Sequence, residues 1–290
     1  MATQLSIRLE AVVTVRSWSA ARVVNVRAVI PDVAVVAHRG SSGSAPENTI
    51  AAVELAVHEQ ASFVEVDVQR TADGELVVVH DTTLARTTDV ARVFPDRAPW
   101  RVGEFTRSEL DRLDAGSWCG SDFLGEPIPT LSDVVDTIGG ATGLMLELKA
   151  PKLYPGIEAQ VVDELSARNE WLTGALRSDQ LVVQSFRRRS VRAFADLAPD
   201  IPTALLFWRR PTSVELRAAS WWVRQVNLSQ RVADRRLVDQ VHALGMTTGL
   251  YTVNTADRMQ DCLGVGADAV ITDYPRLLQD VLARPELAAA

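Results

Sequence analysis

The segment between residues 38 and 81 concentrates side chains that could do chemistry. It reads His38-Arg-Gly, then Glu65-Val-Asp67, then His80-Asp81, and each motif stands at the end of a strand-like apolar run. Charged and titratable groups are costly beside a hydrophobic core unless they pair with each other, with a metal or with a ligand. The motifs hold two of the four histidines of the chain. We therefore expect the functional site to be built around this segment.

Three carboxylates are candidate metal ligands. Glu65 and Asp67 are two residues apart on a predicted strand, so both side chains point to the same face. Glu147 ends another strand, in Glu147-Leu-Lys149. Converging carboxylates repel one another without a cation, and their hard oxygen atoms suit Mg²⁺ or Ca²⁺ rather than zinc. A network of buried salt bridges with Arg39 and Lys149 is the alternative interpretation.

The histidines and the cations indicate phosphoryl-transfer chemistry. His38 and His80 are candidates for a general acid–base pair, because imidazole titrates near neutral pH. The planar guanidinium of Arg39 suits phosphate oxygens, and Lys149 adds a point charge for the same anion. We find neither a G-x-S-x-G motif nor a P-loop, which argues against acyl transfer and nucleotide binding at those motifs.

From residue 33 onward, apolar runs of strand length alternate with segments of helical periodicity, which is typical of βα units around a parallel sheet. The predicted strands are Val33–Ala37, Phe63–Val68, Leu76–Val79, Leu144–Leu148, Leu181–Gln184, Ala204–Phe207, Gln225–Leu228, Thr248–Val253 and Ala269–Thr272. The clearest helical patterns are Asn48–Gln60, Leu131–Ile138, Ile157–Asn169 and Asp234–Leu244.

Nine runs are one too many for an eight-stranded barrel, and Leu76–Val79 is the exception. The connection from Arg70 to Gly74 is too short for a parallel crossover and contains an Asp-Gly turn signal. An antiparallel hairpin there would bring His80 back beside Glu65. The other runs predict an α/β fold, a (β/α)8 TIM barrel, with its site at the carboxyl ends of the strands. Residues 82 to about 130 lack sustained periodicity and predict an insertion after the hairpin.

The amino-acid composition limits the classes of protein to which the chain can belong. With 290 residues, 47% of them hydrophobic and 23% charged, the chain can bury a large single core. A net charge of −7 argues against a nucleic-acid partner, although an anionic substrate can bind where cations converge. Cys119 and Cys262 have no metal-like spacing and make no disulfide framework, so we expect free thiols in a reducing, cytoplasmic compartment.

The first 30 residues differ from the rest. Arg8, Arg16, Arg22 and Arg27 interrupt short valine clusters, whereas a secretory signal needs roughly 7–15 uninterrupted apolar residues. No later run approaches the roughly 20 apolar residues of a transmembrane helix. We expect an N-terminal extension of unknown role at residues 1–30. A targeting arm, a membrane-surface contact and a misassigned start are the alternatives.

Taken in order, the motifs resemble those of the glycerophosphodiester phosphodiesterase family. The resemblance covers roughly residues 33–285 and depends on several motifs matching together. These are His38-Arg-Gly, Pro46-Glu-Asn-Thr, Glu65-Val-Asp67, Asp73-Gly, Val-His80-Asp81, Arg86-Thr-Thr, Ile128-Pro-Thr-Leu131, Glu147-Leu-Lys149, Gln184-Ser-Phe186, Tyr251-Thr-Val-Asn254 and Thr272-Asp-Tyr-Pro275.

The resemblance implies a TIM-barrel domain at 31–290 that hydrolyses small-molecule glycerophosphodiesters to glycerol 3-phosphate and an alcohol. It implies one divalent cation, Mg²⁺ or Ca²⁺, on Glu65, Asp67 and Glu147. It further implies that His38 and His80 are acid and base, and that Arg39, Lys149 and Tyr251 bind phosphate and substrate. Tyr251 stands where tryptophan is commoner in the family and leaves an aromatic wall. The insertion resembles the family's subdomain that helps form the glycerol-side pocket.

Several alternatives stay open. The nucleophile is either water or the glycerol hydroxyl of the substrate, which would give a cyclic phosphate. A phospholipase D- or sphingomyelinase D-like lyase on lysolipids and a non-catalytic phosphodiester-binding barrel are the other functions considered. Phe207, Trp208 and Arg209 end a strand and are weaker candidates for lining the pocket of the leaving alcohol. The identity of that alcohol and the oligomeric state are open.

Overall fold

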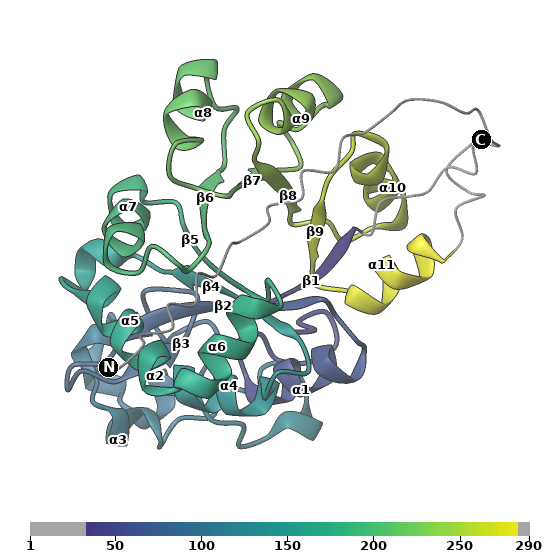
Figure 1. Ribbon diagram of the computed structural model, residues 1–290. Coiled ribbons are helices and arrows are strands. Elements are labelled where there is room, and N and C mark those ends of the chain that lie inside the picture. Colours follow the sequence, from purple (N-terminus) through teal and green to yellow (C-terminus); the bar gives the residue numbers. More distant parts are fainter. Residues whose placement is uncertain (1–32, 284–290) are drawn as a thin grey trace, which may run out of the picture. The chain divides into compact units, whose positions relative to one another are not determined.

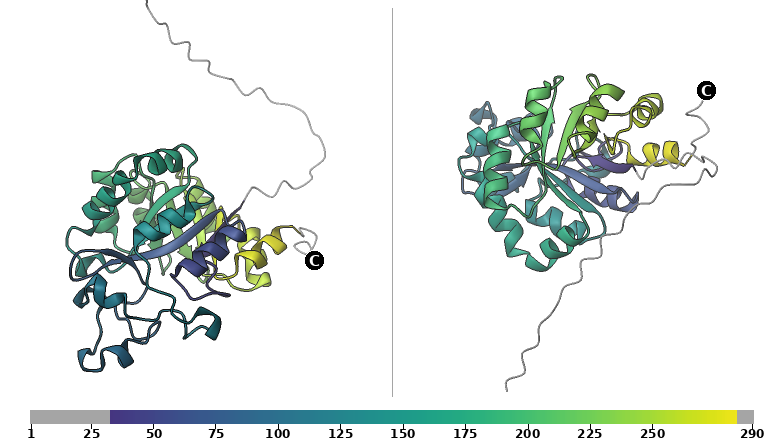
Figure 2. Two further views of the ribbon diagram at one scale, coloured as in Figure 1. Left: turned by 90° about the horizontal axis from the view of Figure 1, so that it is seen from below. Right: turned by 45° about the horizontal axis from the view of Figure 1, so that its top comes forward.

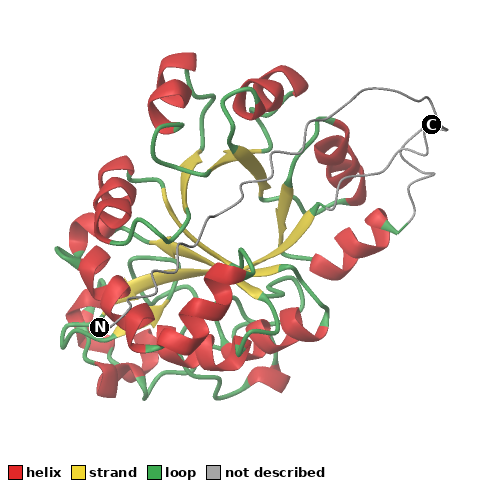
Figure 3. Cartoon of the chain, in the orientation of Figure 1, coloured by secondary structure: helices red, strands yellow, loops and turns green. Residues whose placement is uncertain are grey.

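The computed structural model describes residues 33–283, and these form a closed barrel of parallel strands surrounded by helices (Figures 1 and 3). In this range the eight parallel strands are β1 (Ala34–His38), β2 (Phe63–Arg70), β4 (Gly143–Leu148), β5 (Leu181–Ser185), β6 (Thr203–Phe207), β7 (Gln225–Ser229), β8 (Thr247–Tyr251) and β9 (Ala269–Thr272). Their order is β1-β9-β8-β7-β6-β5-β4-β2, and pairing of β1 with β2 closes the ring. The predicted barrel is confirmed; the predicted N-terminal extension lies outside the described residues.

Helices cover the outside of the ring, as Figure 2 (right) also shows. Those that follow the strands are α1 (Ile50–His58), α4 (Leu131–Ile138), α5 (Ile157–Ala167), α6 (Asn169–Arg177), α7 (Arg188–Leu197), α8 (Ser213–Ala219), α9 (Arg235–His242), α10 (Ala256–Gly264) and α11 (Pro275–Leu282). A short 3-10 turn, η4 (Pro151–Leu153), precedes α5. The helix predicted at Ile157–Asn169 is wrong at its end, because Arg168 leaves helical geometry and its side chain binds Asp136 and Ser132 of α4.

The predicted hairpin is present. β3 (Leu76–Val78) pairs antiparallel with β2, with Val78 opposite Val68. Within the turn the hydroxyl of Thr71 donates to Asp73 and accepts from the backbone N–H of Glu75. Gly74 has a φ of +98°, a left-handed conformation that glycine adopts without steric cost. The hairpin therefore returns the chain along β2 toward the carboxyl end of the barrel.

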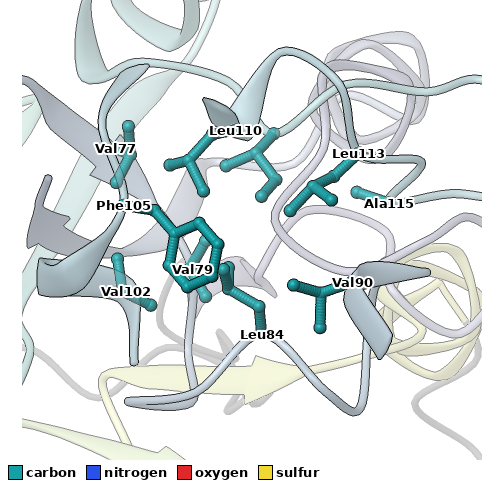
Figure 4. Packing of buried hydrophobic residues seen from close by; sticks show 10 residues of the cluster. Val77, Val79, Leu84, Val90, Val102, Phe105, Leu110, Leu113 and Ala115 are labelled. Carbon is teal, nitrogen blue, oxygen red and sulfur yellow. The ribbon is translucent and has the colours of Figure 1, made fainter. Parts of the chain in front are cut away.

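The insertion between β3 and α4 has a hydrophobic core of its own, shown in Figure 4. Its short elements are α2 (Val90–Val93), η1 (Pro95–Arg97), η2 (Val102–Glu104), α3 (Arg107–Leu110) and η3 (Ser121–Phe123). Figure 2 (left) shows these blue to blue-green segments gathered on one side of the barrel. Phe105, Leu84 and Leu110 are fully buried there and pack with Val77 and Val79 of the hairpin. Because Val79 is held in this core, the insertion helps to position the next residue, His80.

The barrel interior changes from apolar to polar along the strands. Val36, Met145 and Ile271 belong to an apolar cluster inside the ring. Two residues further along their strands stand His38 and Glu147, so the same alternation that packs the core directs these side chains inward. The polar layer lies toward the carboxyl ends of the strands, where barrel enzymes place their sites.

Two further findings concern the described residues as a whole. Both cysteines are free, Cys119 exposed and Cys262 buried. The cytoplasmic location, which rested on these cysteines, stays a prediction. No helix in residues 33–283 is long and apolar enough to cross a membrane.

Candidate active site

The three predicted carboxylates meet inside the mouth of the barrel. Glu65 and Asp67 lie on β2, and the pairing of β2 with β4 places Glu147 opposite Asp67. All three are buried, and one oxygen from each lies within 4.8 Å of the other two. The structure therefore brings together the ligand set that the sequence predicted, in a space small enough for one cation.

Two cations contact this cluster. The Lys149 ammonium lies 3.0 Å from Asp67 Oδ1 and 2.9 Å from Glu147 Oε1. Arg39 Nε lies 3.4 Å from Asp67 Oδ2, and the backbone N–H of Arg39 donates to Glu65 Oε2 at 3.0 Å. With three carboxylates and two cations, the five side chains carry one excess negative charge when all are ionised.

Burial and mutual repulsion raise the pKa values of two of these acids, whereas the two cations lower that of the third. Burial, followed by the Asp67 charge, raises the pKa of Glu147 to about 7. The same causes, with Glu147 added, raise the pKa of Glu65 well above its ordinary value. For Asp67 burial also acts upward, but Lys149 and Arg39 outweigh it and lower the pKa. The raised pKa values show that the two cations do not fully compensate the negative charges of the cluster. A further cation would do so, and the buried carboxylate oxygens fit a hard divalent cation.

His38 is held by a carboxylate from the far end of the chain. Its Nδ1 lies 2.6 Å from Asp273 Oδ1. Asp273, directly after β9, also accepts hydrogen bonds from Asn254 Nδ2 at 2.5 Å and from the Ser42 hydroxyl at 3.1 Å. Because an ionised carboxylate only accepts, His38 Nδ1 donates, and Nε2 is the nitrogen left for a substrate.

His80 has an equivalent arrangement with its own neighbour. Its Nδ1 lies 2.6 Å from Asp81 Oδ1, and Arg86 Nε donates to Asp81 Oδ2 at 2.8 Å. Hydrogen bonding from Arg86 is the largest influence on Asp81, whose pKa falls to about 2. Burial, together with the charges of Arg39 and Lys149, lowers the pKa of His80. The lowered pKa favours the neutral form of His80, which has a free lone pair on Nε2.

The turn after β1 explains the spacing of the His38-Arg-Gly motif. Arg39 has a φ of +57° and Gly40 a φ of +81°. A Cβ on Gly40 would lie 2.5 Å from the backbone carbon of Ala52 in α1, so only glycine fits there. Arg39 Nη1 donates to Glu47 at 2.8 Å, and Arg86 binds the same carboxylate through two bonds of 2.7 Å. Glu47 thus ties the insertion to the guanidinium of Arg39.

Three adjoining cavities open at this end of the barrel. The central cavity, of about 180 Å³, is lined by seven of the eight predicted site residues, with Asp67 as the exception. A polar cavity of about 500 Å³ extends from it along His80, Asp81 and the threonines that begin the insertion. A cavity of about 180 Å³ extends toward β6 and Trp208. Phe186 lines all three and so stands where they meet.

Tyr251, the predicted aromatic wall, lines the central cavity. Its ring meets that of Phe186 edge to face, with 5.9 Å between centroids. Its hydroxyl is buried and has no hydrogen-bond partner among the described residues. Burial, then the charge of Glu147, raises its pKa. The hydroxyl therefore stays a donor at neutral pH.

Sequence reasoning assigned no role to several residues that hold the site together. Asn48 donates to Asp67 Oδ2 at 2.9 Å, and Gln184 contacts Glu65 Oε1 at 3.4 Å while accepting from Asn227 at 2.7 Å. Asp273 could have been found, because it directly follows a predicted strand in the Thr272-Asp-Tyr-Pro motif. For Asn227, in the middle of β7, we see no signal in the sequence.

The parallel barrel carries acids, carboxylate-bound histidines and cations together at the carboxyl ends of its strands. This combination is that of a barrel of the phosphodiesterase class. The comparison with known families agrees. The model of the glycerophosphoryl diester phosphodiesterase family matches residues 38–277, so this chain belongs to that family of enzymes, as the sequence predicted.

Individual relatives match most of the chain. The chain is 34% identical to a glycerophosphodiester phosphodiesterase of Caldanaerobacter subterraneus, over 84% of this chain and 95% of the relative. It is 31% identical to a glycerophosphodiester phosphodiesterase of Bacillus subtilis, over 87% of each. A phosphodiesterase of Oleispira antarctica, solved with its product sn-glycerol-3-phosphate, superposes with a TM-score of 0.74 at 31% identity, over 86% of this chain and 96% of that one.

Proposed function

We propose that this protein hydrolyses glycerophosphodiesters to glycerol 3-phosphate and an alcohol, with the help of a divalent cation. The observation that carries the proposal is that His38 and His80, each oriented by a carboxylate, line one cavity with Arg39 and Lys149. The product held by the Oleispira relative is the product expected here.

Glu65, Asp67 and Glu147 would hold the cation, Mg²⁺ or Ca²⁺. Once bound, it supplies charge that stabilises the phosphodiester oxygens as negative charge builds on them. Arg39 acts on the same oxygens, and its contacts with Glu47 and Asp67 fix the guanidinium before the substrate arrives. Lys149 adds a second fixed positive charge. Such preorganised charges lower the barrier because they need no rearrangement during the reaction.

The histidines divide the proton transfers. His80, in its neutral form, accepts the proton of the attacking hydroxyl at Nε2 as the new P–O bond forms. His38 donates a proton from Nε2 to the alcohol oxygen as the old P–O bond breaks. The two Nδ1–carboxylate bonds keep the rings oriented and leave Nε2 of each ring for proton transfer. One turnover with water thus moves one proton to His80 and one from His38, and solvent restores both.

The attacking hydroxyl is that of water or the 2-hydroxyl of the substrate's glycerol. Phosphorus NMR followed over time separates the two routes, because only the second passes through a cyclic phosphate, which gives a transient signal of its own. Accumulation of the cyclic phosphate as final product would instead assign the lyase function.

A substrate panel tests the proposal. Glycerol 3-phosphate release is measured from diesters of several alcohols, with Mg²⁺, with Ca²⁺ and with a chelator. We expect release that requires the metal and is lost with the chelator. Absence of release from every diester with both metals would contradict the proposed function.

A further inference from the structure

The cavity beside β6, which we call the aromatic arm, is lined by eight residues, of which five are apolar or aromatic and three are charged. It has a volume of about 180 Å³ and shares Phe186 and Leu206 with the central cavity. Trp208, directly after β6, lines it and is 72% exposed. Large apolar side chains exposed at the rim of a site gain stability when an apolar group covers them.

The aromatic arm is continuous with the candidate catalytic groups. Tyr251 in the central cavity contacts Phe186 edge to face, and Phe186 lines both cavities. Phe186 and Leu206 therefore connect the cavity of the acids and histidines with the cavity that Trp208 lines. The polar cavity, by contrast, begins at His80 and Asp81 and is lined by Thr82 and Thr83, whose hydroxyls suit a polyol.

The charges of the aromatic arm disfavour a cationic ligand. Its only ionised side chains among the described residues are Arg188, Arg209 and Glu215. Arg209 neutralises Glu215 through two hydrogen bonds of 3.0 and 2.5 Å. Arg188 leaves one net positive charge. An aromatic site for a quaternary ammonium needs ring faces without a competing cation, and this cavity does not meet that condition.

From these contacts we infer that the aromatic arm binds the departing alcohol and selects glycerophosphodiesters whose alcohol is uncharged and carries an alkyl chain. The inference rests on the proposed function and names its substrate class. The glycerol then occupies the polar cavity, and the phosphate lies between the two at Arg39 and Lys149. Esters of choline and ethanolamine, which bring a positive charge into the arm, are the poorer substrates.

A chain-length series tests the apolar contact. Glycerol 3-phosphate esters of ethanol, butanol, hexanol and octanol are assayed below the concentrations at which they form micelles. Full burial of a methylene group corresponds to about a fourfold gain, so kcat/KM should rise about two- to fourfold per methylene until the arm is filled. A flat series, with every ester hydrolysed, would overturn this inference and leave the proposed function intact. If none of the esters is hydrolysed, the ethyl ester included, the proposed function is overturned and this inference with it.

A matched pair of substrates isolates the effect of a positive charge on the departing alcohol. Glycerophosphocholine and the ester of 3,3-dimethylbutanol have nearly the same shape, but only the first carries a positive charge. We expect kcat/KM to favour the uncharged ester by about tenfold or more. Preference for the choline ester would overturn the electrostatic part of the inference.

The Trp208→Ala variant tests whether the departing alcohol binds in the aromatic arm. The variant should flatten the chain-length series, lowering kcat/KM about tenfold for the octyl ester and less than twofold for the ethyl ester. Trp221→Ala is the control, because Trp221 is 88% exposed and precedes β7, at the opposite end of the strands. It should leave the series unchanged. A series equally steep in Trp208→Ala and in the unmodified protein would overturn the assignment to this arm.

Discussion

The two halves of the barrel mouth are held in place by different forces. The charged half comprises His38, Arg39, Glu65, Asp67, His80, Glu147 and Lys149, from β1 to β4. Its acids are buried, and its histidines and cations are fixed by hydrogen bonds and ion pairs. The aromatic half comprises Phe186, Trp208 and Tyr251, at the ends of β5, β6 and β8. Phe186 is 40% exposed, and its ring is held by packing and one edge-to-face contact.

This difference suggests that the two halves have different tasks, catalysis in the charged half and selection of the alcohol in the aromatic half. A buried charge that loses one partner costs several kcal/mol, so residues of the charged half are not replaced singly without loss of function or stability. An exposed aromatic residue costs far less to replace. The charged half therefore fixes the reaction, whereas the aromatic half can change and alter which alcohol is accepted. Substitutions in each half should consequently give effects of different size and kind.

The largest effects should follow removal of the proton-transfer groups. His38→Ala and His80→Ala should each lower kcat by about 10²–10⁴, with cation binding retained. His242→Ala is the control, because His242 forms a similar pair with Asp268, at 2.7 Å, before β9 at the other end of the barrel. It should retain nearly full activity. Steady-state kinetics and calorimetric titration of the cation measure the two properties, and near-normal turnover by both alanine variants would contradict the roles assigned.

The Glu65→Gln substitution should lower the activity of the protein without lowering the stability of its cation-free form. The cation loses one charged ligand, and since charge stabilisation by a metal is worth several kcal/mol, activity should fall about 10²–10³. The cation-free protein should not become less stable, because burial and repulsion already raise the pKa of this carboxyl. Urea unfolding without metal measures the second effect. A loss of more than about 2 kcal/mol there would show that Glu65 serves chiefly as an ion-pair partner.

Cation affinity should depend on pH through Glu147. In the cation-free protein its pKa is raised to about 7, so below that pH the cation must displace a proton. The dissociation constant should rise by about tenfold or more for each pH unit below 7. Titration calorimetry between pH 5.5 and 8, in two buffers of different ionisation enthalpy, also counts the released protons. Glu147→Gln should release about one proton fewer; an affinity independent of pH would contradict the repulsion that we describe.

The same comparison explains which parts could be predicted from sequence. Glu65, Asp67 and Glu147 were predictable because charged residues at alternate positions at the end of an apolar run are rare and direct their side chains to one face. The hairpin was predictable from Asp73 and Gly74, which mark a turn in a connection too short for a crossover.

The rest depends on contacts between distant parts of the chain. Asp273 reaches His38 only because β1 pairs with β9, which places Ala37 beside Thr272. The core of the insertion is built from apolar residues without periodicity, so its packing on Val79 leaves no local pattern. Trp208 follows a predicted strand, which made it a candidate for lining a pocket, but only the structure shows that its cavity adjoins the central one.

The smallest effect concerns Tyr251, where the two halves meet. Its hydroxyl is buried without a partner among residues 33–283, and such an unsatisfied group costs about 1–3 kcal/mol. Tyr251→Phe should therefore raise the free energy of unfolding by about 1 kcal/mol. Because Tyr251 lines the central cavity and its hydroxyl stays protonated, the same change should lower kcat/KM about three- to tenfold, the value of one neutral hydrogen bond to substrate.

Tyr154→Phe is the matched control. The Tyr154 hydroxyl is also buried but donates to Gln69 Oε1 at 2.8 Å, so its removal should destabilise the protein by about 1 kcal/mol. The two substitutions delete the same atom, and opposite signs in urea unfolding would identify the Tyr251 hydroxyl as a group kept for the substrate. If Tyr251→Phe destabilised the protein as much as Tyr154→Phe, the hydroxyl would have a structural partner, and Tyr251 would belong to the scaffold of the charged half.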